Sequence, residues 1–309
     1  MELSIGIDIG GTKTNIALIS PKGEIVEINN FATNALSPNK LKEDLIKGIG
    51  KIIDKQANIK GIGLASAGRV NFNKNKIVYA TDNLKGWAEI PITSIIEERF
   101  QLPVYLDNDV NAALLCDLTL HPEYASSPIT IFLTIGTGLG GAIAINDNIL
   151  RGSCGSVGEF GHTILYPNGH QCNCGKRGCA EQYISGTAYK KRLIEKFELR
   201  DEYYSKEDLT PSIIEKNIFK GKEPYTSTLK EMVQDLAYLL ETIKNCIDFD
   251  ICIIGGGFTV YEQIIIEELN KHFKSYNHKY YKKPRFLFST EGNNAGVIGA
   301  GLMVFRNIS

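Results

Sequence analysis

Residues 3–20 read L-S-I-G-I-D-I-G-G-T-K-T-N-I-A-L-I-S, and this stretch decides the fold. Two β-rich runs, residues 3–9 and 14–20, are joined by a short Gly-Gly-Thr-Lys turn, and residues 23–32 continue as a third strand. This pattern predicts a β-hairpin that opens into a meander. Because the glycine turn joins two strands, it differs from a Walker A loop, which joins a strand to a helix.

The composition is that of a globular protein with two domains. The chain has 309 residues, 43% of them hydrophobic, with 34 Lys and Arg against 35 Asp and Glu, so its formal net charge is −1. Low net charge argues against disorder and against a nucleic-acid surface, and the length favours two domains. The short apolar runs and the absence of a secretion signal predict a cytoplasmic protein without membrane or nucleic-acid partners.

The opening pattern recurs in the second half of the chain. Residues 129–135 and 139–145 are predicted strands joined by a second glycine turn, so a duplicated β-meander core is expected. The polar stretch 121–128 carries two prolines and is the expected domain boundary. The predicted domains are residues 1–120 and 121–293. A small-residue helix within residues 294–309 is expected to join the first domain.

Hydrophobic periodicity predicts the remaining elements of an α/β protein. Helices are expected over 38–57, from 91, and over 110–118, 229–247, 260–272 and 295–305, and strands over 59–65, 76–80, 104–106, 251–254 and 286–289.

Three glycine turns form candidate phosphate sites. They comprise Gly10, Gly11, Thr12 and Lys13; Gly136, Thr137 and Gly138; and Gly255, Gly256 and Gly257. Consecutive backbone N–H groups in such turns bind anions, and glycine allows close approach of phosphate oxygens and positive φ. Asp8, beside the first turn, is a candidate ligand for a Mg²⁺ ion that accompanies phosphates. One glycine turn is more often a plain hairpin, but three indicate a nucleotide held between two lobes.

Asp107-Asn108-Asp109 follows a strand and precedes a helix, and supplies a candidate general base. Transfer of a phosphoryl group to a hydroxyl requires a carboxylate that accepts the hydroxyl proton. Either Asp could instead cap the helix. Spacing alone does not choose between Asp107 and Asp109.

His162 and three cysteines, Cys172, Cys174 and Cys179, match a closed Cys₃His zinc site. His170 is a rival fourth ligand because it lies nearer to the cysteines in the sequence. A zinc-ribbon module for nucleic acid is the other functional interpretation. The charge of −1 and the single cluster argue against it.

Taken together, four motifs resemble those of the ROK (repressor, open reading frame, kinase) family of sugar kinases. They are D-I-G-G-T-K at 8–13, L-D-N-D-V-N-A-A at 106–113, G-E-F-G-H at 158–162 and C-N-C-G-K-R-G-C-A-E at 172–181. The resemblance spans residue 5 to about residue 300. It implies a two-domain actin-like (ribonuclease H-like) ATPase fold with ATP in the inter-domain cleft, and a homodimer.

The resemblance also implies roles for individual residues. The family pattern makes Asp109 the base and has Asn108 contact the sugar. It has Glu159, His162 and Glu181 bind the hexose hydroxyls, and it makes His162 the fourth zinc ligand. It implies ATP, Mg²⁺ and a structural Zn²⁺ as cofactors.

The segment around Gly68 and Arg69 departs from the commonest family pattern. Many members have Pro-Gly-Pro-Val-Asp here, whereas this chain has Ser-Ala-Gly-Arg-Val-Asn at 66–71 followed by Thr81. This looks more like the N-acetylmannosamine kinases, in which case Arg69 and Thr81 would hold the substituent at C2. The alternative is that Arg69 is a surface charge in a loop.

The expected activity is ATP-dependent phosphorylation of the 6-hydroxyl of a hexose, with N-acetylmannosamine or glucose as substrate. N-acetylglucosamine and β-glucosides are alternatives. A non-catalytic sugar-responsive regulator is the alternative of another class. The repressors of the family carry a helix-turn-helix domain before the first phosphate motif, which starts here within eight residues of Met1.

Overall fold

The computed structural model describes residues 1–56, 58–80, 84–125, 127–276 and 282–308. The chain separates into two compact units. Unit 1 consists of Met1–Phe132, Ala142–Gly158 and Ser289–Ser309, and unit 2 of Leu133–Gly141 and Glu159–Phe288. The domain boundary at residues 120/121 stays a prediction.

Unit 1 is built on a mixed sheet that begins with the predicted hairpin. Its strands are β1 (Leu3–Ile9), β2 (Lys13–Ile19), β3 (Ile25–Ala32), β4 (Ile59–Ser66) and β7 (Val104–Asn108). The strand order is β3-β2-β1-β4-β7. β1 is antiparallel to β2 and parallel to β4, and β4 is parallel to β7. The carboxyl ends of the three parallel strands therefore meet at one edge, which is where α/β sheets bind ligands.

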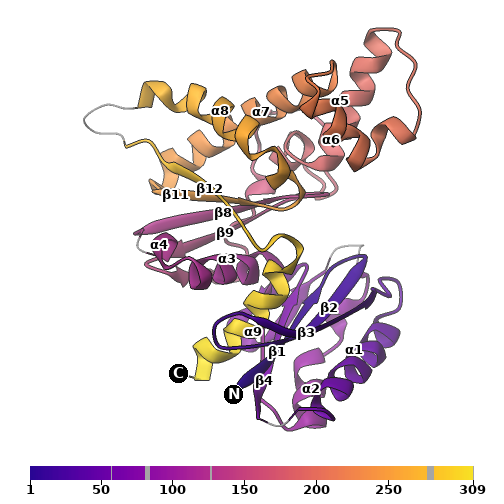
Figure 1. Cartoon of the computed structure of the whole chain (residues 1–309), viewed down its shortest axis with the longest axis vertical. Coiled ribbons are helices and arrows are strands. Elements are labelled where there is room, and N and C mark those ends of the chain that lie inside the picture. Colours follow the sequence, from indigo (N-terminus) through magenta and orange to yellow (C-terminus); the bar gives the residue numbers. More distant parts are fainter. Residues whose placement is uncertain (57, 81–83, 126, 277–281, 309) are drawn as a thin grey trace. The chain divides into compact units, whose positions relative to one another are not determined.

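One helix of unit 1 packs unusually closely against this sheet. The helices of this unit are α1 (Pro38–Ile53), α2 (Ile92–Phe100), α3 (Asp109–Leu120), α4 (Pro122–Ala125) and α9 (Ala295–Ile308). A Cβ added at Gly63 of β4 would lie 1.8 Å from the carbonyl oxygen of Ala300, and one at Gly299 would lie 1.8 Å from that of Ala112. Glycine is therefore required where α9 crosses the sheet and α3 (Figure 1).

A small antiparallel hairpin, β5 (Arg69–Asn71) and β6 (Lys76–Tyr79), extends from unit 1. The only tryptophan of the chain, Trp87, is 1% exposed and belongs to the hydrophobic core of this unit. Its indole N–H donates to Ser66 Oγ at 3.3 Å. Trp87 is therefore a natural fluorescent reporter of the folding of unit 1.

The second sheet has the order β10-β9-β8-β11-β12. Its strands are β8 (Ile129–Ile135), β9 (Leu139–Ile145), β10 (Asn148–Ile149), β11 (Ile251–Gly255) and β12 (Arg285–Phe288). As predicted, β8 and β9 flank the second glycine turn. β10 is antiparallel to β9, and β12 is parallel to β11.

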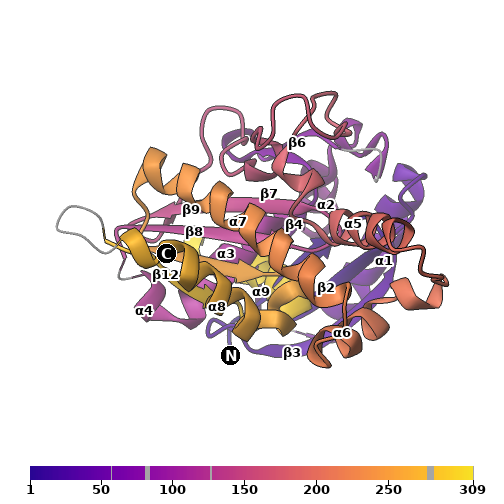
Figure 2. The same cartoon turned by 90° about the horizontal axis from the view of Figure 1, so that it is seen from above.

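The helices of unit 2 are α5 (Gly186–Leu199), α6 (Pro211–Phe219), α7 (Tyr225–Ile247) and α8 (Glu262–His272). α7 and α8 lie side by side (Figures 1 and 2). The buried stripe of α7 includes Met232, Leu236 and Ile243, at the spacing of one helix face. Within the described residues, no helix is both long and apolar enough to cross a membrane.

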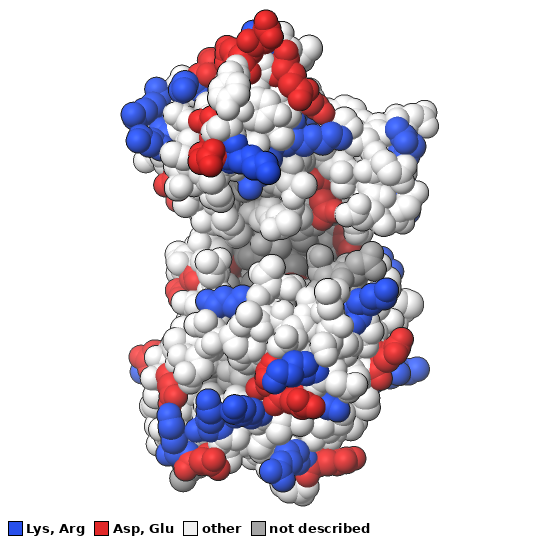
Figure 3. Space-filling view, turned by 90° about the vertical axis from the view of Figure 1, so that its right-hand side faces the viewer, with Lys and Arg blue, Asp and Glu red and all other residues white. Residues whose placement is uncertain are grey.

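Charged side chains of both signs lie on the face drawn in Figure 3. Lys and Arg lie beside Asp and Glu over both units there. Asp and Glu form a run along the top of this view, whereas side chains of both signs are interspersed lower down.

Candidate active site and metal centre

Asp107 is a structural carboxylate in the turn between β7 and α3. Its side chain is 4% exposed, and its Oδ2 lies 2.7 Å from Nη2 and 2.8 Å from Nε of Arg151. Its Oδ1 accepts from the backbone N–H of Asn108 and from Nδ2 of Asn111, both at 2.8 Å. Both oxygens are thus engaged, Oδ1 within the turn and Oδ2 by Arg151.

Asp109 is the first residue of α3, so its carboxylate lies at the positive end of a helix. Its Oδ1 accepts from Asn108 Nδ2 at 2.8 Å and from the N–H of Val110 at 3.0 Å. Asn108 is the N-cap, because its Oδ1 accepts from the N–H of Val110 and of Asn111. Its Nδ2 also donates to the carbonyl of Gly68 at 2.9 Å, so the cap holds Asp109 and the loop before β5 together.

Asp8 is a second carboxylate at this edge of the sheet. The pKa of its carboxyl is raised from 3.8 to about 7, mainly by burial and also by the negative charge of Asp109, while a hydrogen bond from Asn15 opposes the rise. A Cβ added at Gly296 would lie 2.9 Å from Asp8 Cγ and Oδ2. The structure thus brings the predicted magnesium ligand and the predicted base together at the carboxyl ends of β1 and β7. A divalent cation would compensate the charge of Asp8, so the donor chemistry fits Mg²⁺.

The first glycine turn is closed by a hydrogen bond from the N–H of Gly10 to the carbonyl of Lys13 at 3.1 Å. The expectation that glycine in the first turn adopts positive φ is wrong for Gly10 and Gly11; among the three turns, only Gly256 has positive φ, at 85°. Close approach explains Gly10 instead, since a Cβ there would lie 3.1 Å from the carbonyl of Lys13.

The second and third glycine turns lie together in unit 2. A cavity of about 310 Å³ lies between them. Its lining includes Gly136, Thr137, Gly257, Phe258 and Tyr261. A Cβ at Gly136 or Gly257 would meet nothing within 4 Å, so these glycines leave open space above the backbone. The cavity combines aromatic walls with backbone N–H groups, as sites for a planar base and its phosphates do.

Glu181 contacts the second turn directly. Its Oε2 accepts from the N–H of Leu139 at 3.1 Å, and a Cβ at Gly138 would lie 2.4 Å from that oxygen. Glu181 itself lies in the 3₁₀ turn Ala180–Gln182, directly after the last cysteine of the cluster. The structure therefore joins a predicted sugar ligand to a predicted phosphate turn.

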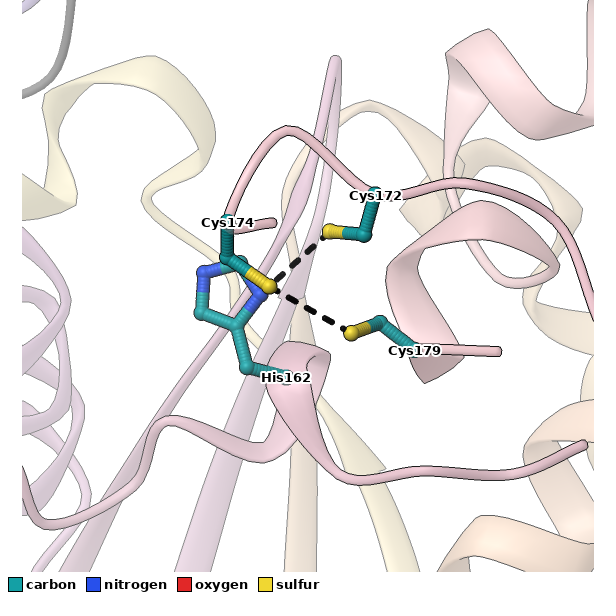
Figure 4. A group of neighbouring side chains, drawn as sticks. All are labelled: His162, Cys172, Cys174 and Cys179. Carbon is teal, nitrogen blue, oxygen red and sulfur yellow. Dashed lines mark hydrogen bonds between the residues drawn. The ribbon is translucent and has the colours of Figure 1, made fainter. Parts of the chain in front are cut away.

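The four predicted zinc ligands converge (Figure 4). Their ligand atoms all lie within 4.8 Å of one another. Cys174 Sγ lies 3.5 Å from Cys179 Sγ, and Cys172 Sγ lies 3.8 Å from His162 Nδ1. A tetrahedral zinc with 2.3 Å bonds to sulfur would space its ligand atoms by about 3.8 Å. The spacing of the donor atoms therefore fits Zn²⁺.

The backbone and the electrostatics of the cluster are consistent with a cation. Gly175 and Gly178 adopt φ of 88° and 80°, which tightens the loop. Burial, together with hydrogen bonds to the neighbouring thiols, raises the pKa of Cys179 to about 12. A thiol in this setting ionises readily only beside a positive charge. The rival ligand His170 instead lies against Tyr183, with ring centroids 5.0 Å apart.

His162 connects the metal cluster to a predicted sugar ligand. Its Nδ1 faces the sulfurs, while its Nε2 lies 3.9 Å from Glu159 Oε2. If Nδ1 binds the metal, the proton of the ring resides on Nε2 and points toward Glu159. The two side chains thus form one polar pair beside the cluster.

The remaining predicted sugar residues lie in unit 1 or outside the described part of the chain. Gly68 has φ of 104°, and a Cβ there would lie 2.3 Å from the carbonyl of Tyr79. The guanidinium of Arg69 lies 5.6 Å from the ring centroid of Tyr79. Thr81 lies outside the described residues, so its predicted contact stays a prediction.

Sequence reasoning missed Arg151, Phe258 and Tyr261. The aromatic pair follows the third glycine turn within six residues, which was an available signal for a base-binding wall. Arg151 belongs to no motif, and its role is visible only through its contacts with Asp107.

Comparison with known proteins identifies a matching family. The ROK family model matches residues 4–307. A glucokinase from Halalkalibacterium halodurans is 30% identical over 97% of this chain and 94% of its own length. An N-acetylmannosamine kinase from Haemophilus influenzae is also 30% identical, over 97% and 94%. Xylose repressors are among the relatives too.

The solved structures include a ROK family glucokinase from Streptomyces griseus in complex with glucose and AMPPNP. It is 25% identical to this chain, covers 98% of it and 99% of its own length, and superposes with a TM-score of 0.84. The predicted actin-like ATPase fold class is therefore confirmed.

Proposed function

The chain belongs to the ROK family, and from this premise we propose that it transfers the γ-phosphoryl group of ATP to the 6-hydroxyl of a hexose or N-acetylhexosamine. The observation that carries the proposal is the different environment of the two acidic residues in the turn after β7. Asp107 forms an ion pair with Arg151 and hydrogen bonds within the turn. Asp109 instead lies at the start of α3, near Asp8. This favours Asp109 as the general base.

Asp109 accepts the proton of the sugar hydroxyl as its oxygen attacks the γ-phosphorus. The hydrogen bond from Asn108 and the position at the start of α3 hold this carboxylate in a fixed orientation. Asn108 contacts the sugar in the family pattern. The hydrogen bond from Asn108 Nδ2 to Asp109 Oδ1 supports a second role for Asn108, which is to orient the proposed base.

The phosphates are assigned to the glycine turns and the metal to Asp8. Bound Mg²⁺ neutralises charge on the transferring phosphoryl group. The turn Gly10–Lys13 contributes N–H groups, the Thr12 hydroxyl and the Lys13 ammonium. The turns at 136–138 and 255–257 share the cavity in unit 2, whose aromatic walls support binding of the adenine base.

The sugar hydroxyls are assigned to Glu159, His162 and Glu181, with Gly68, Arg69 and Thr81 on the side of C2. Because His162 Nε2 lies near the carboxylate of Glu159, we expect the two side chains to contact the sugar together. Zn²⁺, held by His162, Cys172, Cys174 and Cys179, would fix the loop that carries these residues. This role is structural.

N-acetylmannosamine and glucose are the proposed substrates, with N-acetylglucosamine and β-glucosides next. The kinases named above support this choice, and Ser-Ala-Gly-Arg-Val-Asn at 66–71 favours an N-acetyl group at C2. The resemblance also supports a homodimer, which sedimentation velocity tests.

The deciding experiment measures kcat/KM across these sugars with a coupled ADP-release assay. Asp109→Asn should lower kcat by about 10²–10⁴-fold, the typical contribution of a general base. Wild-type protein that releases no ADP in response to any of the sugars would instead support the regulator.

A further inference from the structure

Arg151 contacts the predicted catalytic turn through Asp107, although it belongs to no recognised motif. It follows β10, and its side chain is 23% exposed. Nε and Nη2 both donate to Asp107 Oδ2, and Nη1 donates to the carbonyl of Ile149 at 3.2 Å. Its guanidinium carbon lies 3.8 Å from the ring centroid of Phe72, so it stacks on that ring.

The pair with Asp107 controls the geometry of the turn. Asp107 Oδ1 accepts from the N–H of Asn108, one residue before Asp109, and from the side-chain amide of Asn111, two residues after it. Without the guanidinium, a carboxylate that is only 4% exposed would lose its counter-charge. The turn would then have to rearrange.

Arg151 also contacts the β5–β6 hairpin, which carries the proposed sugar residue Arg69. Phe72 directly follows β5, which begins at Arg69. A Cβ added at Gly155 would lie 1.8 Å from the carbonyl oxygen of Val70, so the segment after Arg151 packs tightly along this hairpin. Since the carbonyl of Gly68 accepts from Asn108, the hairpin and the turn are joined twice, once through Asn108 and once through Arg151.

We propose that Arg151 is a positioning residue for phosphoryl transfer, which holds Asp109 and the Arg69 hairpin in the arrangement that the reacting sugar requires. This inference rests on the proposed kinase function. In the step itself, the sugar oxygen bonds to the γ-phosphorus while the bond from that phosphorus to the β,γ-bridging oxygen breaks. The hydroxyl proton passes to Asp109. Arg151 takes no proton and acts through Asp107.

The experiment compares Arg151→Ala, Arg151→Lys and a matched control, Arg192→Ala. Arg192 pairs with Asp235 in unit 2, and the exposed fractions of that pair, 21% and 8%, are close to the 23% and 4% of Arg151 and Asp107. Each variant is assayed for kcat and for KM of ATP and sugar. Trp87 fluorescence and the unfolding midpoint check that unit 1 is folded.

Arg151→Ala should lose about 10²-fold in kcat, the cost of misplacing a catalytic group by roughly 1 Å, with little change in KM for ATP. Guanidinium ion below denaturing concentration should restore part of this kcat, whereas methylammonium should not, because it lacks the planar fork. Arg151→Lys should fall between wild type and Arg151→Ala. Arg192→Ala should keep its turnover and show no response to guanidinium.

Unchanged kcat in Arg151→Ala overturns the inference, and so does a loss of kcat that guanidinium leaves untouched. If Arg151→Ala does not fold, Arg151→Lys decides: a lower kcat at constant KM for ATP supports positioning, and wild-type kcat refutes it. Failure of the wild-type protein to phosphorylate any sugar refutes the proposed function instead, so the two failures are distinguishable.

Discussion

Asp8 should lower the stability of unit 1 at neutral pH, and Asp8→Asn should remove that penalty. The pKa of its carboxyl is raised from 3.8 to about 7, first by burial and then by the charge of Asp109. The folded state therefore binds this proton more tightly than the unfolded chain. Between pH 4 and pH 7 the unfolded chain has released the proton and the folded state has not, so stability falls as pH rises.

The shift of about three pKa units corresponds to an upper limit of about 4 kcal/mol at pH 8, at about 1.4 kcal/mol per unit. The Asn side chain keeps an acceptor for Asn15. Its buried amide N–H groups cost about 1–3 kcal/mol if they find no partner. This cost does not depend on pH. The advantage of Asp8→Asn over wild type should therefore be larger at pH 8 than at pH 5 by about 2–3 kcal/mol.

Urea unfolding followed by Trp87 fluorescence measures this difference, because Trp87 lies in the core of the same unit. The buffer contains no magnesium and no chelator, so that any zinc stays in unit 2. Asp54→Asn is the control, since Asp54 is an exposed carboxylate at the end of α1. The Asp8→Asn protein should also lose phosphoryl transfer.

An advantage of Asp8→Asn that is equal at pH 5 and pH 8 would refute the reasoning. It would mean that the Asp8 carboxylate is hydrated or already compensated in the folded protein. A pH-dependent gain of the same size in Asp54→Asn would attribute the effect to general charge rather than to burial.

Three further perturbations test other parts of the site. Gly296→Ala places a Cβ 2.9 Å from the carboxylate of Asp8, and should lower kcat at least about tenfold, as displacement of catalytic groups does, with Trp87 fluorescence unchanged. Stripping zinc with a chelator should raise KM for the sugar while leaving the urea transition of unit 1 in place, and metal analysis should find one zinc per chain before treatment. Asp117→Asn should stabilise the protein by about 1–2 kcal/mol more at pH 8 than at pH 5. Burial raises the pKa of that carboxyl to about 6 against the hydrogen bond from Ser289, and its Oδ2 has no hydrogen-bond partner among the described residues.

Local patterns in the sequence were sufficient to predict the framework. The runs at 3–9 and 14–20 are the hairpin β1 and β2, and the apolar spacing over 38–57 is helix α1. These predictions succeeded because strand and helix periods are properties of neighbouring residues. The cysteine cluster was predictable for the same reason, since three of its four ligands lie within eight residues.

Contacts between distant residues could not be predicted in this way. Sequence spacing did not distinguish Asp107 from Asp109 as the base. The ion pair of Asp107 with Arg151, which lies 44 residues later in the sequence, indicates a structural role for Asp107. The ligand choice between His162 and His170 likewise depends on which ring the folded loop turns toward the sulfurs. The sequence by itself determined the motifs and the chemistry that each residue offers. The tertiary structure decided which of these groups are buried and which form ion pairs, because burial and ion pairing depend on the whole packed fold.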